Sequence, residues 1–345
     1  MPELTVSSVL TAERSVGIRE VARLSGVSIA TVSRVFNDAA AVNPETRERV
    51  LEQAQALNYQ PSSLGRNLVR GRSELLGLIV PNVAFPLYGE MIGGIEEVLG
   101  REGMSILLAL SHDNVDSEFT AAQHLLRHAV DGGIIINSRL GLNAPLPAPR
   151  GLNWVQVAPE HTGTPHRVEL DNEAGGRLAA LEMLGLGRRR LAFVGAPGRE
   201  SADRERGFAA ELRRAGLIYR RAQGDYSEAS GVQAAGELLE HNAAVDAVFV
   251  AGDLMAAGVL RALHQRGLRV PEAVAVVGFD DAAIASLLYP RLTSIRQPAR
   301  AMGTAAAELS LRLLGGHRTE PITFPPELVR RESTGPPSRL SARHF

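Results

Sequence analysis

The sequence predicts a multidomain fold, in which a small all-α helix-turn-helix domain precedes a larger α/β domain with two lobes. The chain has 345 residues, of which 45% are hydrophobic and 22% are charged. It is therefore too long for one ordinary core and too apolar to stay unfolded. Helical patterns without a strand-like run occupy residues 18–58, whereas short apolar runs alternate with amphipathic helices from Leu75 nearly to the C-terminus.

The composition argues against several classes of protein. No stretch approaches the roughly 18 consecutive apolar residues of a membrane span. The first 17 residues lack the basic start and apolar core of a secretion signal, so we expect a cytoplasmic protein. The chain has no cysteine, which excludes disulfides and thiolate metal sites.

The net charge of −1 conceals a basic N-terminal segment. Residues 18–72 hold eight arginines against five acidic residues, which gives +3 there and leaves the remaining chain acidic. This asymmetry keeps a nucleic-acid partner open despite the acidic average.

The most specific local pattern is IREVARLSGVSIATVSRVFN at 18–37, which has the form of a helix-turn-helix. Ala22 is small where two helices must cross, Gly26 permits the positive φ of the turn, and Ser28 can cap the second helix. The predicted interior consists of Val21, Leu24, Val27, Val32 and Val35.

This arrangement leaves the start of the second helix exposed, where a recognition helix places its base-contacting side chains. The residues concerned are Ile29, Ala30, Thr31, Ser33 and Arg34. Arg34 is expected to read guanine or to hold a phosphate. The alternative is a helical hairpin that serves packing alone.

The segment that follows favours the DNA-binding interpretation. Pro44 suits a first helical turn, and Val50, Ala54 and Leu57 form an apolar stripe, so 44–58 completes a three-helix domain. Residues 59–72 could form one more short helix, but Gly65 and the short length make an isolated helix unstable. We expect this linker to be disordered without DNA.

The remaining chain predicts a doubly wound α/β architecture. The expected strands cover 75–80, 105–110, 132–136, 154–157, 190–194, 247–250 and 274–278, and are apolar on both faces, as covered parallel strands must be. The expected helices cover 88–101, 118–128, 175–184, 203–215, 231–241, 254–266 and 299–314. A Pro/Gly-rich stretch at 140–151 interrupts the alternation, which indicates two lobes with a cleft between them.

Seven motifs occur in order along the chain: VARLSGVS at 21–28, TVSR at 31–34, PETRERV at 44–50, LNY at 57–59, GLIVP at 77–81, GFDD at 278–281 and LTSIRQ at 292–297. On these motifs, residues 18–334 resemble the lactose-repressor (LacI/GalR) family of bacterial transcription regulators. The resemblance implies a homodimer that represses transcription by binding a palindromic operator.

The resemblance also assigns roles in DNA binding. The linker would fold into a hinge helix in the minor groove, where Leu68 of each subunit wedges between bases. Gly65 departs from the family's usual alanine, so the hinge helix is expected to form less readily. The expected DNA-binding residues are Arg19, Ser28, Ile29, Ala30, Thr31, Ser33, Arg34, Asn37, Thr46, Tyr59, Ser62, Arg66 and Leu68.

The family's effector domain is similar to periplasmic sugar-binding proteins, with three chain crossovers between the lobes. We place these near Val168, Tyr289 and Phe324, with a final strand at 328–331. The expected organisation is a disordered tail (1–17), a helix-turn-helix domain (18–60), a hinge (61–72), an effector-binding and dimerisation domain (73–334) and a tail (335–345). The first lobe would hold 73–167 and 290–323, and the second 168–289 and 324–334.

A small-molecule effector is expected between the lobes, at the carboxyl ends of the strands. By resemblance, Arg204 is a multidentate donor, Asp280 an acceptor and Tyr226 a stacking ring. The first lobe would contribute Phe85, Leu87 and Tyr88, and the second also Gly252 and Asp253. Gly252 and Ala158 stand where sugar-binding members often have asparagine and aspartate. The effector can therefore be a sugar, a sugar phosphate, a nucleoside or a nucleobase.

The sequence shows no catalytic constellation. It has no Gly-x-Ser-x-Gly motif, no Walker loop and no Gly-x-Gly-x-x-Gly after a strand, so we expect neither an enzyme nor a cofactor. His124 and His128 share a helical face without a third ligand nearby, and solvated surface is the simpler interpretation. The alternatives are a regulator controlled by a protein partner and, more remotely, a transport binding protein or an enzyme on the same fold.

Overall fold

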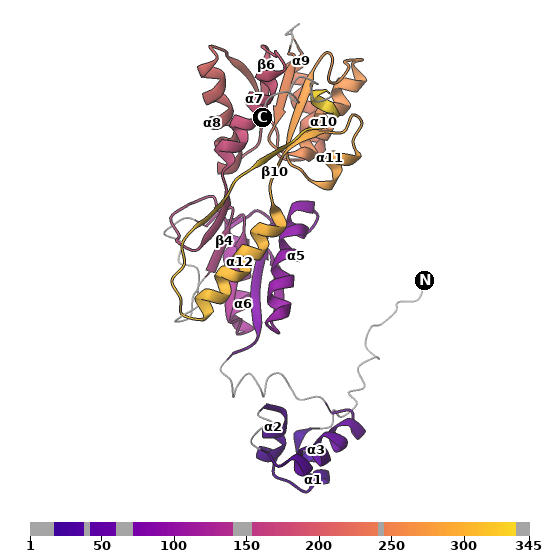
Figure 1. Cartoon of the computed structure of the whole chain (residues 1–345), viewed down its shortest axis with the longest axis vertical. Coiled ribbons are helices and arrows are strands. Elements are labelled where there is room, and N and C mark those ends of the chain that lie inside the picture. Colours follow the sequence, from indigo (N-terminus) through magenta and orange to yellow (C-terminus); the bar gives the residue numbers. More distant parts are fainter. Residues whose placement is uncertain (1–16, 38–41, 60–71, 141–153, 241–244, 336–345) are drawn as a thin grey trace, which may run out of the picture. The chain divides into compact units, whose positions relative to one another are not determined.

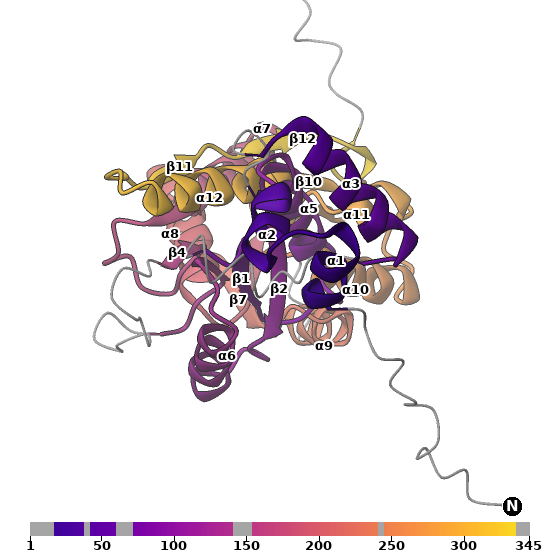
Figure 2. The same cartoon turned by 90° about the horizontal axis from the view of Figure 1, so that it is seen from below.

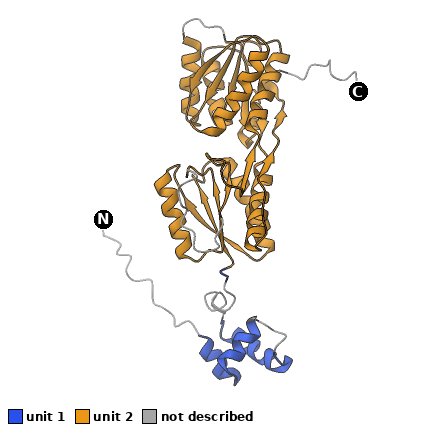
Figure 3. Ribbon diagram, turned by 90° about the vertical axis from the view of Figure 1, so that its left-hand side faces the viewer, with its two compact units in different colours: residues 1–73 blue, residues 74–345 orange. Residues whose placement is uncertain are grey.

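The computed structural model describes residues 17–37, 42–59, 72–140, 154–240 and 245–335. The chain divides into two compact units, residues 1–73 and 74–345 (Figure 3). Ser62, Gly65, Arg66 and Leu68 of the linker lie outside the described residues, as do the tails at 1–16 and 336–345. No helix in the described ranges is long and apolar enough to cross a membrane.

The first unit contains the three expected helices: α1 (Ile18–Ser25), α2 (Ile29–Asn37) and α3 (Pro44–Ala56). Gly26 ends α1 at φ 67°, and its N–H donates to carbonyls of the last turn. The Ser28 Oγ accepts from the Thr31 N–H at 3.1 Å and so caps α2. Asn43 caps α3 ahead of Pro44. These local signals set the helix ends.

The small core of the first unit contains residues from all three helices. Val21, Ala22, Val32, Val35, Val50 and Ala54 are buried, with Val27 and Leu57 packed against them. Leu24 was expected in the interior, but it is 42% exposed. The buried stripe of α1 follows positions 18, 21, 22 and 25, and position 24 lies at its flank. Arg49 donates to the Ser25 carbonyl at 3.0 Å and so joins α3 to the end of α1.

The first lobe of the second unit is built on a parallel sheet in the order β11-β5-β4-β3-β1-β2. Its strands are β1 (Leu75–Val80), β2 (Ser105–Leu110), β3 (Gly132–Ile136), β4 (Trp154–Val157), β5 (Arg167–Leu170) and β11 (Ile322–Phe324). The helices around this sheet are α5 (Pro86–Arg101), α6 (Val115–Arg127) and α12 (Ala299–Leu314) (Figure 1). Seen from below, α6 and α12 of the first lobe lie on opposite sides of β1 and β2 (Figure 2).

The second lobe repeats this plan in the order β12-β10-β9-β8-β6-β7. Its strands are β6 (Leu191–Gly195), β7 (Tyr219–Gln223), β8 (Ala247–Val250), β9 (Ala275–Asp280), β10 (Thr293–Arg296) and β12 (Glu327–Val329), which runs antiparallel to β10. Its helices are α7 (Asn172–Gly185), α8 (Arg199–Arg214), α9 (Glu228–Leu239), α10 (Asp253–Gln265) and α11 (Ala283–Leu287), followed by a 3₁₀ turn at Glu332–Thr334.

Glycines let helices of each lobe approach closely. A Cβ on Gly176 of α7 would lie 1.9 Å from the Arg204 carbonyl oxygen of α8, and one on Gly207 would lie 1.9 Å from that of Glu173. Gly94 and Gly303 allow the same contact between α5 and α12. In the second lobe, this contact sets the position of Arg204 against the sheet.

The chain crosses between the lobes three times (Figure 1). The crossings fall between β5 and α7, between β10 and α12, and between β11 and β12. They were expected near Val168, Tyr289 and Phe324, and the second expectation is wrong. Residues 293–296 form β10, which pairs with β9, so this segment belongs to the second lobe. Residues 168–170 and Phe324 belong to strands of the first lobe.

The expected strands and helices correspond to observed elements, with ends shifted by a few residues. The strands that the sequence did not predict are β5, β7, β10 and β11. They have three to five residues, and polar side chains interrupt their apolar pattern. Pairing with a neighbouring strand, which the local pattern does not report, makes them strands.

Candidate functional site

The predicted DNA-reading residues of α2 lie mostly at its surface. Ile29 is 46% exposed, and Ala30 and Arg34 are exposed, whereas Thr31 and Ser33 are half-buried. Ser28 is exposed, but its hydroxyl is used by the cap and lies 2.9 Å from the Thr31 hydroxyl. Asn37 ends the helix.

The other predicted residues of the first unit differ in their surroundings. Arg19 is exposed on α1, and Thr46 is half-buried in the first turn of α3. Tyr59 packs edge-on against Phe36, with ring centroids 5.9 Å apart, and its partial burial raises the pKa of its hydroxyl. The Tyr59 ring therefore serves the small core as well as any contact with DNA.

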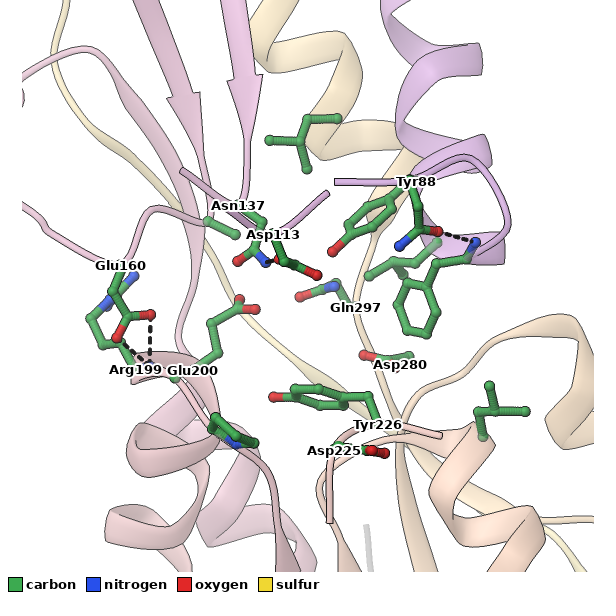
Figure 4. A pocket seen from close by; sticks show the side chains of 18 of the residues that line it. Tyr88, Asp113, Asn137, Glu160, Arg199, Glu200, Asp225, Tyr226, Asp280 and Gln297 are labelled. Atoms are coloured by element: carbon green, nitrogen blue, oxygen red, sulfur yellow. Dashed lines mark hydrogen bonds between the residues drawn. The ribbon is translucent and has the colours of Figure 1, made fainter. Parts of the chain in front are cut away.

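A cavity of about 570 Å³ lies between the two lobes of the second unit (Figure 4). Six of the eight predicted effector residues line it: Phe85, Leu87, Tyr88, Arg204, Tyr226 and Asp280. Phe85 and Tyr88 belong to the turn into α5 and its first residues, with ring centroids 5.3 Å apart. The other polar side chains come from the carboxyl ends of strands, from the loops that follow them, or, as Arg204 does, from the beginning of the next helix, as expected for an open α/β sheet.

Arg204 is 2% exposed and is held from several sides. Its Nε donates to the Asn172 Oδ1 at 2.8 Å, and its Nη1 donates to the Ala251 carbonyl at 2.5 Å. The guanidinium carbon lies 3.6 Å from the centroid of the Phe279 ring. The side chain is therefore fixed before any ligand arrives.

Asp280 follows the last apolar residues of β9 and is 5% exposed. Its φ of 104° is unusual for a residue with a side chain. Burial raises the pKa of its carboxyl to about 7, against the lowering effect of Arg204, whose Nη1 lies 3.9 Å from the Asp280 Oδ1. Asp280 can therefore change its protonation near neutral pH.

Gly252 and Asp253 do not line the cavity. A Cβ on Gly252 would lie 3.1 Å from the Tyr226 ring, so the glycine leaves room for that ring. The Asp253 carboxylate accepts from the Ser294 hydroxyl at 2.7 Å and from the Ala282 N–H at 2.8 Å. Asp253 thus holds the turn after β9 against β10 and is buried behind the site.

Several lining residues were not predicted: Asp113, Asn137, Arg139, Glu160, Arg199, Glu200, Asp225 and Gln297. Asn137 directly follows the apolar strand β3, a position that could have indicated it. Gln297 closes one of the motifs at 292–297 but had no role assigned. Ala158, the other departure noted in the sequence, also lines the cavity.

Two charged contacts shape the cleft. Both Glu160 carboxylate oxygens accept from the Arg199 N–H at 3.0 Å, which joins the loop after β4 to the start of α8 across the cleft. Glu118 of α6 is buried and accepts from the Ser138 hydroxyl and from the Arg139 N–H. It thereby holds the loop that carries Asn137.

A metal site finds no support in the described ranges, where no cluster of three or more histidine or acidic ligands occurs. His124 on α6 and His128 directly after this helix are both exposed.

Comparisons with known proteins cover nearly the whole chain. Residues 17–62 match the model of bacterial regulatory proteins of the lacI family, and residues 180–334 match a periplasmic binding protein-like domain. The transcriptional regulator CelR of Thermobifida fusca is 36% identical, over 91% of this chain and 96% of its own. The chain belongs to the lacI family of bacterial regulatory proteins. The resemblance inferred from the seven motifs is confirmed.

Other members of the lacI family agree with this assignment. GalR of Salmonella typhimurium is 34% identical, over 93% of this chain and 96% of its own. A lac repressor dimer bound to operator and an anti-inducer superposes with a TM-score of 0.87 at 29% identity, covering 94% of this chain and all of the other. A CelR–cellobiose complex superposes with a TM-score of 0.69 at 33% identity, over 92% and 99%.

Membership of the lacI family decides the functional class. The protein is a DNA-binding transcription regulator with a domain of the kind that binds effectors, and it is not an enzyme. The expected fold, a helix-turn-helix unit joined to a two-lobed α/β domain, is likewise confirmed.

Proposed function

We propose that this protein is a cytoplasmic repressor that binds a palindromic operator as a homodimer and whose operator affinity is controlled by a sugar or a related metabolite in the cleft. The cavity lined by Arg204, Tyr226 and Asp280 carries the proposal, because it joins a pre-positioned donor, a ring and an acceptor. A nucleoside or nucleobase is the less favoured effector.

The DNA side of the proposal rests on the exposed start of α2. Arg34 and Ile29 project from a helix whose other face is buried in the core of the first unit. One recognition helix reads only a few base pairs, so two copies related by a two-fold axis would read a palindrome. The lac repressor that superposes on this chain is described as a dimer on its operator.

The three crossover segments support the proposal that an effector in the cleft controls operator affinity. A ligand that touches both lobes favours one angle between them, and the three crossover segments are where this angle changes. Gln297 lines the cavity and belongs to the second crossover, so ligand contact and lobe movement meet at one residue. In the dimer, such a movement would alter the spacing of the two linkers and hence operator affinity.

The test is selection of binding sites from random duplex DNA by the full chain at a stated, near-physiological salt concentration. We expect enrichment of a palindrome with a C·G-containing centre, bound by two copies of the chain. Metabolites are then screened for those that change the affinity for this site. Absence of enrichment in the presence of candidate effectors contradicts the proposal. A selected site whose affinity responds to no metabolite favours control by a protein partner.

A further inference from the structure

The side chains that line the cleft include more acidic than basic groups. Five carboxyl groups line it, those of Asp113, Glu160, Glu200, Asp225 and Asp280, against the three guanidinium groups of Arg139, Arg199 and Arg204. Because the pKa of Asp280 is raised to about 7, the other four are the ones counted as negative charges, and they still outnumber the guanidinium groups. Figure 4 shows Asp113, Glu200 and Asp280 from different elements around the same space. A ligand that enters this space therefore meets a surplus of hydrogen-bond acceptors.

The three guanidinium groups already have partners in the protein. Arg199 donates from Nε to the Pro159 carbonyl at 2.9 Å, from Nη1 to Asp203 and from Nη2 to Glu169. Arg204 is held by Asn172 and Ala251.

Arg139 lies 3.5 Å from the Asp113 carboxylate. An anionic ligand would have to displace some of these partners in order to be neutralised.

The start of α8 points at the cleft but is also occupied. A helix N-terminus with free N–H groups attracts phosphate and carboxylate groups. Here the Glu160 carboxylate takes the Arg199 N–H with both of its oxygens. The protein's own carboxylate thus fills the place where a phosphate would bind, and its charge would repel a second anion nearby.

Acceptors remain open to a ligand in the middle of the cleft. The side-chain oxygen of Gln297 is buried, with 5% of the residue exposed, and has no hydrogen-bond partner in the described part of the chain. The Asp280 carboxylate has Arg204 at 3.9 Å as its charged neighbour. Figure 4 places Gln297 between Tyr88 and Asp280. Buried acceptors of this kind are satisfied by a ligand that donates.

We propose that the cleft selects an uncharged, hydroxyl-rich effector and rejects the phosphorylated form of the same sugar. Hydroxyl groups donate to Gln297, Asp280 and Glu200, and the rings of Tyr88 and Tyr226 cover the apolar face of the sugar. A phosphate carries roughly two negative charges and would enter a cleft that has more carboxyl groups than guanidinium groups, and whose guanidinium groups already contact protein partners. This inference rests on the proposed function, since it assigns the chemical class of the effector.

The test is calorimetric binding to the full chain with matched pairs: cellobiose, glucose and ribose, and the terminal phosphate of each. We expect a neutral sugar to bind and its phosphate to bind at least about tenfold more weakly. A phosphate that binds as tightly as its parent sugar overturns the proposal, and so does a broad panel of neutral mono- and disaccharides of which none binds.

The same pairs separate this inference from the proposed function. Operator affinity is measured with each sugar that binds. A neutral sugar that binds without changing operator affinity supports the selectivity but contradicts effector control. A sugar phosphate that binds as tightly as its parent sugar and changes operator affinity supports effector control but contradicts the selectivity.

A charge variant tests the physical cause. Glu200→Gln removes one carboxylate from the cleft. It should lower the preference for the neutral sugar, measured as the ratio of its affinity to that of its phosphate, by several-fold. Glu102→Gln makes the same change at an exposed residue after α5, outside the cleft, and should leave the preference unchanged. If Glu200→Gln leaves this preference unchanged, or if both variants change it equally, the charge of the residues that line the cleft does not determine the preference for the neutral sugar.

Discussion

The two units of this protein present their functional residues in opposite ways. In the first unit, most of the candidate residues in the described ranges lie on α2 or at its N-cap, and the same helix helps to build the core. In the second, they come from segments as far apart in the sequence as Tyr88 and Gln297. Arg204 and Asp280 are buried, and Arg204 is held by hydrogen bonds to Asn172 and Ala251. Reading DNA needs an exposed surface, whereas recognising a small molecule needs an enclosed site whose polar groups are fixed in advance.

The comparison predicts that variants in one unit leave the other function intact. The effects of such variants on stability should also differ between the two units. A variant at the exposed surface should weaken binding alone, whereas removal of a hydrogen-bonded side chain from the cleft, such as Arg204, should also lower the unfolding free energy.

Arg204→Ala should have the largest effect. It removes the central donor of the cleft and leaves the Ala251 carbonyl and the Asn172 side chain without their partner. We expect effector affinity to fall by about 100-fold or more, and the second unit to lose about 1–3 kcal/mol of unfolding free energy. Operator affinity without effector should be unchanged. Calorimetry, thermal unfolding and DNA binding measure the three quantities.

Arg206→Ala is the matched control for this change. Arg206 is exposed on the same helix and pairs with Asp203 and Glu173. Its removal should leave the effector response intact. Equal losses in the two variants would mean that α8 as a whole, and not the Arg204 guanidinium, supports binding.

Arg34→Ala should act on the DNA side alone. A base-reading arginine contributes about 1–3 kcal/mol, so we expect operator affinity to fall by roughly 5- to 150-fold and discrimination at one base pair to relax. Effector affinity should not change. The measurement is binding to the selected operator and to single-base variants of it. A uniform loss on all sequences would instead assign Arg34 to a phosphate.

Leu68→Ala tests the linker. If Leu68 wedges between bases, its truncation should weaken specific binding by about tenfold and spare binding to random DNA. The ratio of the two affinities is the readout. An equal loss on random DNA would indicate that Leu68 supports folding of the linker.

Gly252→Ala should have a modest effect confined to the cleft. The added Cβ comes within 3.1 Å of the Tyr226 ring, which must move by a few tenths of an ångström. We expect effector affinity to fall several-fold, with operator affinity unchanged. Ala256→Gly on the same helix, α10, changes one methyl group outside the cavity lining and should leave effector affinity unaltered.

Asp280 should make the stability of the second unit depend on pH. Because burial raises its pKa to about 7 in the fold, well above the usual value for an aspartate, the folded state holds a proton that the unfolded state releases. Its contribution to stability is fully present below about pH 4, declines as pH rises, and is lost by pH 7. Asp280→Asn should therefore unfold at a higher temperature than the parent at pH 8, by a few degrees, and show less difference at pH 4. Parallel unfolding curves across this range would contradict the assignment.

The residues of the first unit could be predicted from the sequence more completely than those of the cleft, because they interact with near neighbours in the chain. The helix-turn-helix depends on residues within one or two turns of each other, such as Gly26 and Ser28, so its pattern is visible in the chain itself. Leu24 was misplaced because a one-position error in helical phase separates a buried stripe from its flank. In the cleft, Arg204, Tyr226 and Asp280 were named through the resemblance to the family, while Asp113, Glu160 and Glu200 were not.

The sequence by itself determined the class of fold and most of the elements, because apolar periodicity and turn residues act over short distances. The family followed from the resemblance carried by the seven motifs. Only the tertiary structure decided which lobe holds β10, that Gly252 makes room for Tyr226, and that Asp253 supports the site from behind. It also decided that each guanidinium group of the cleft contacts partners in the protein, whereas the buried side-chain oxygen of Gln297 has none in the described part of the chain. These features depend on side chains from distant segments that share one desolvated space, and no local pattern reports which of them will meet there.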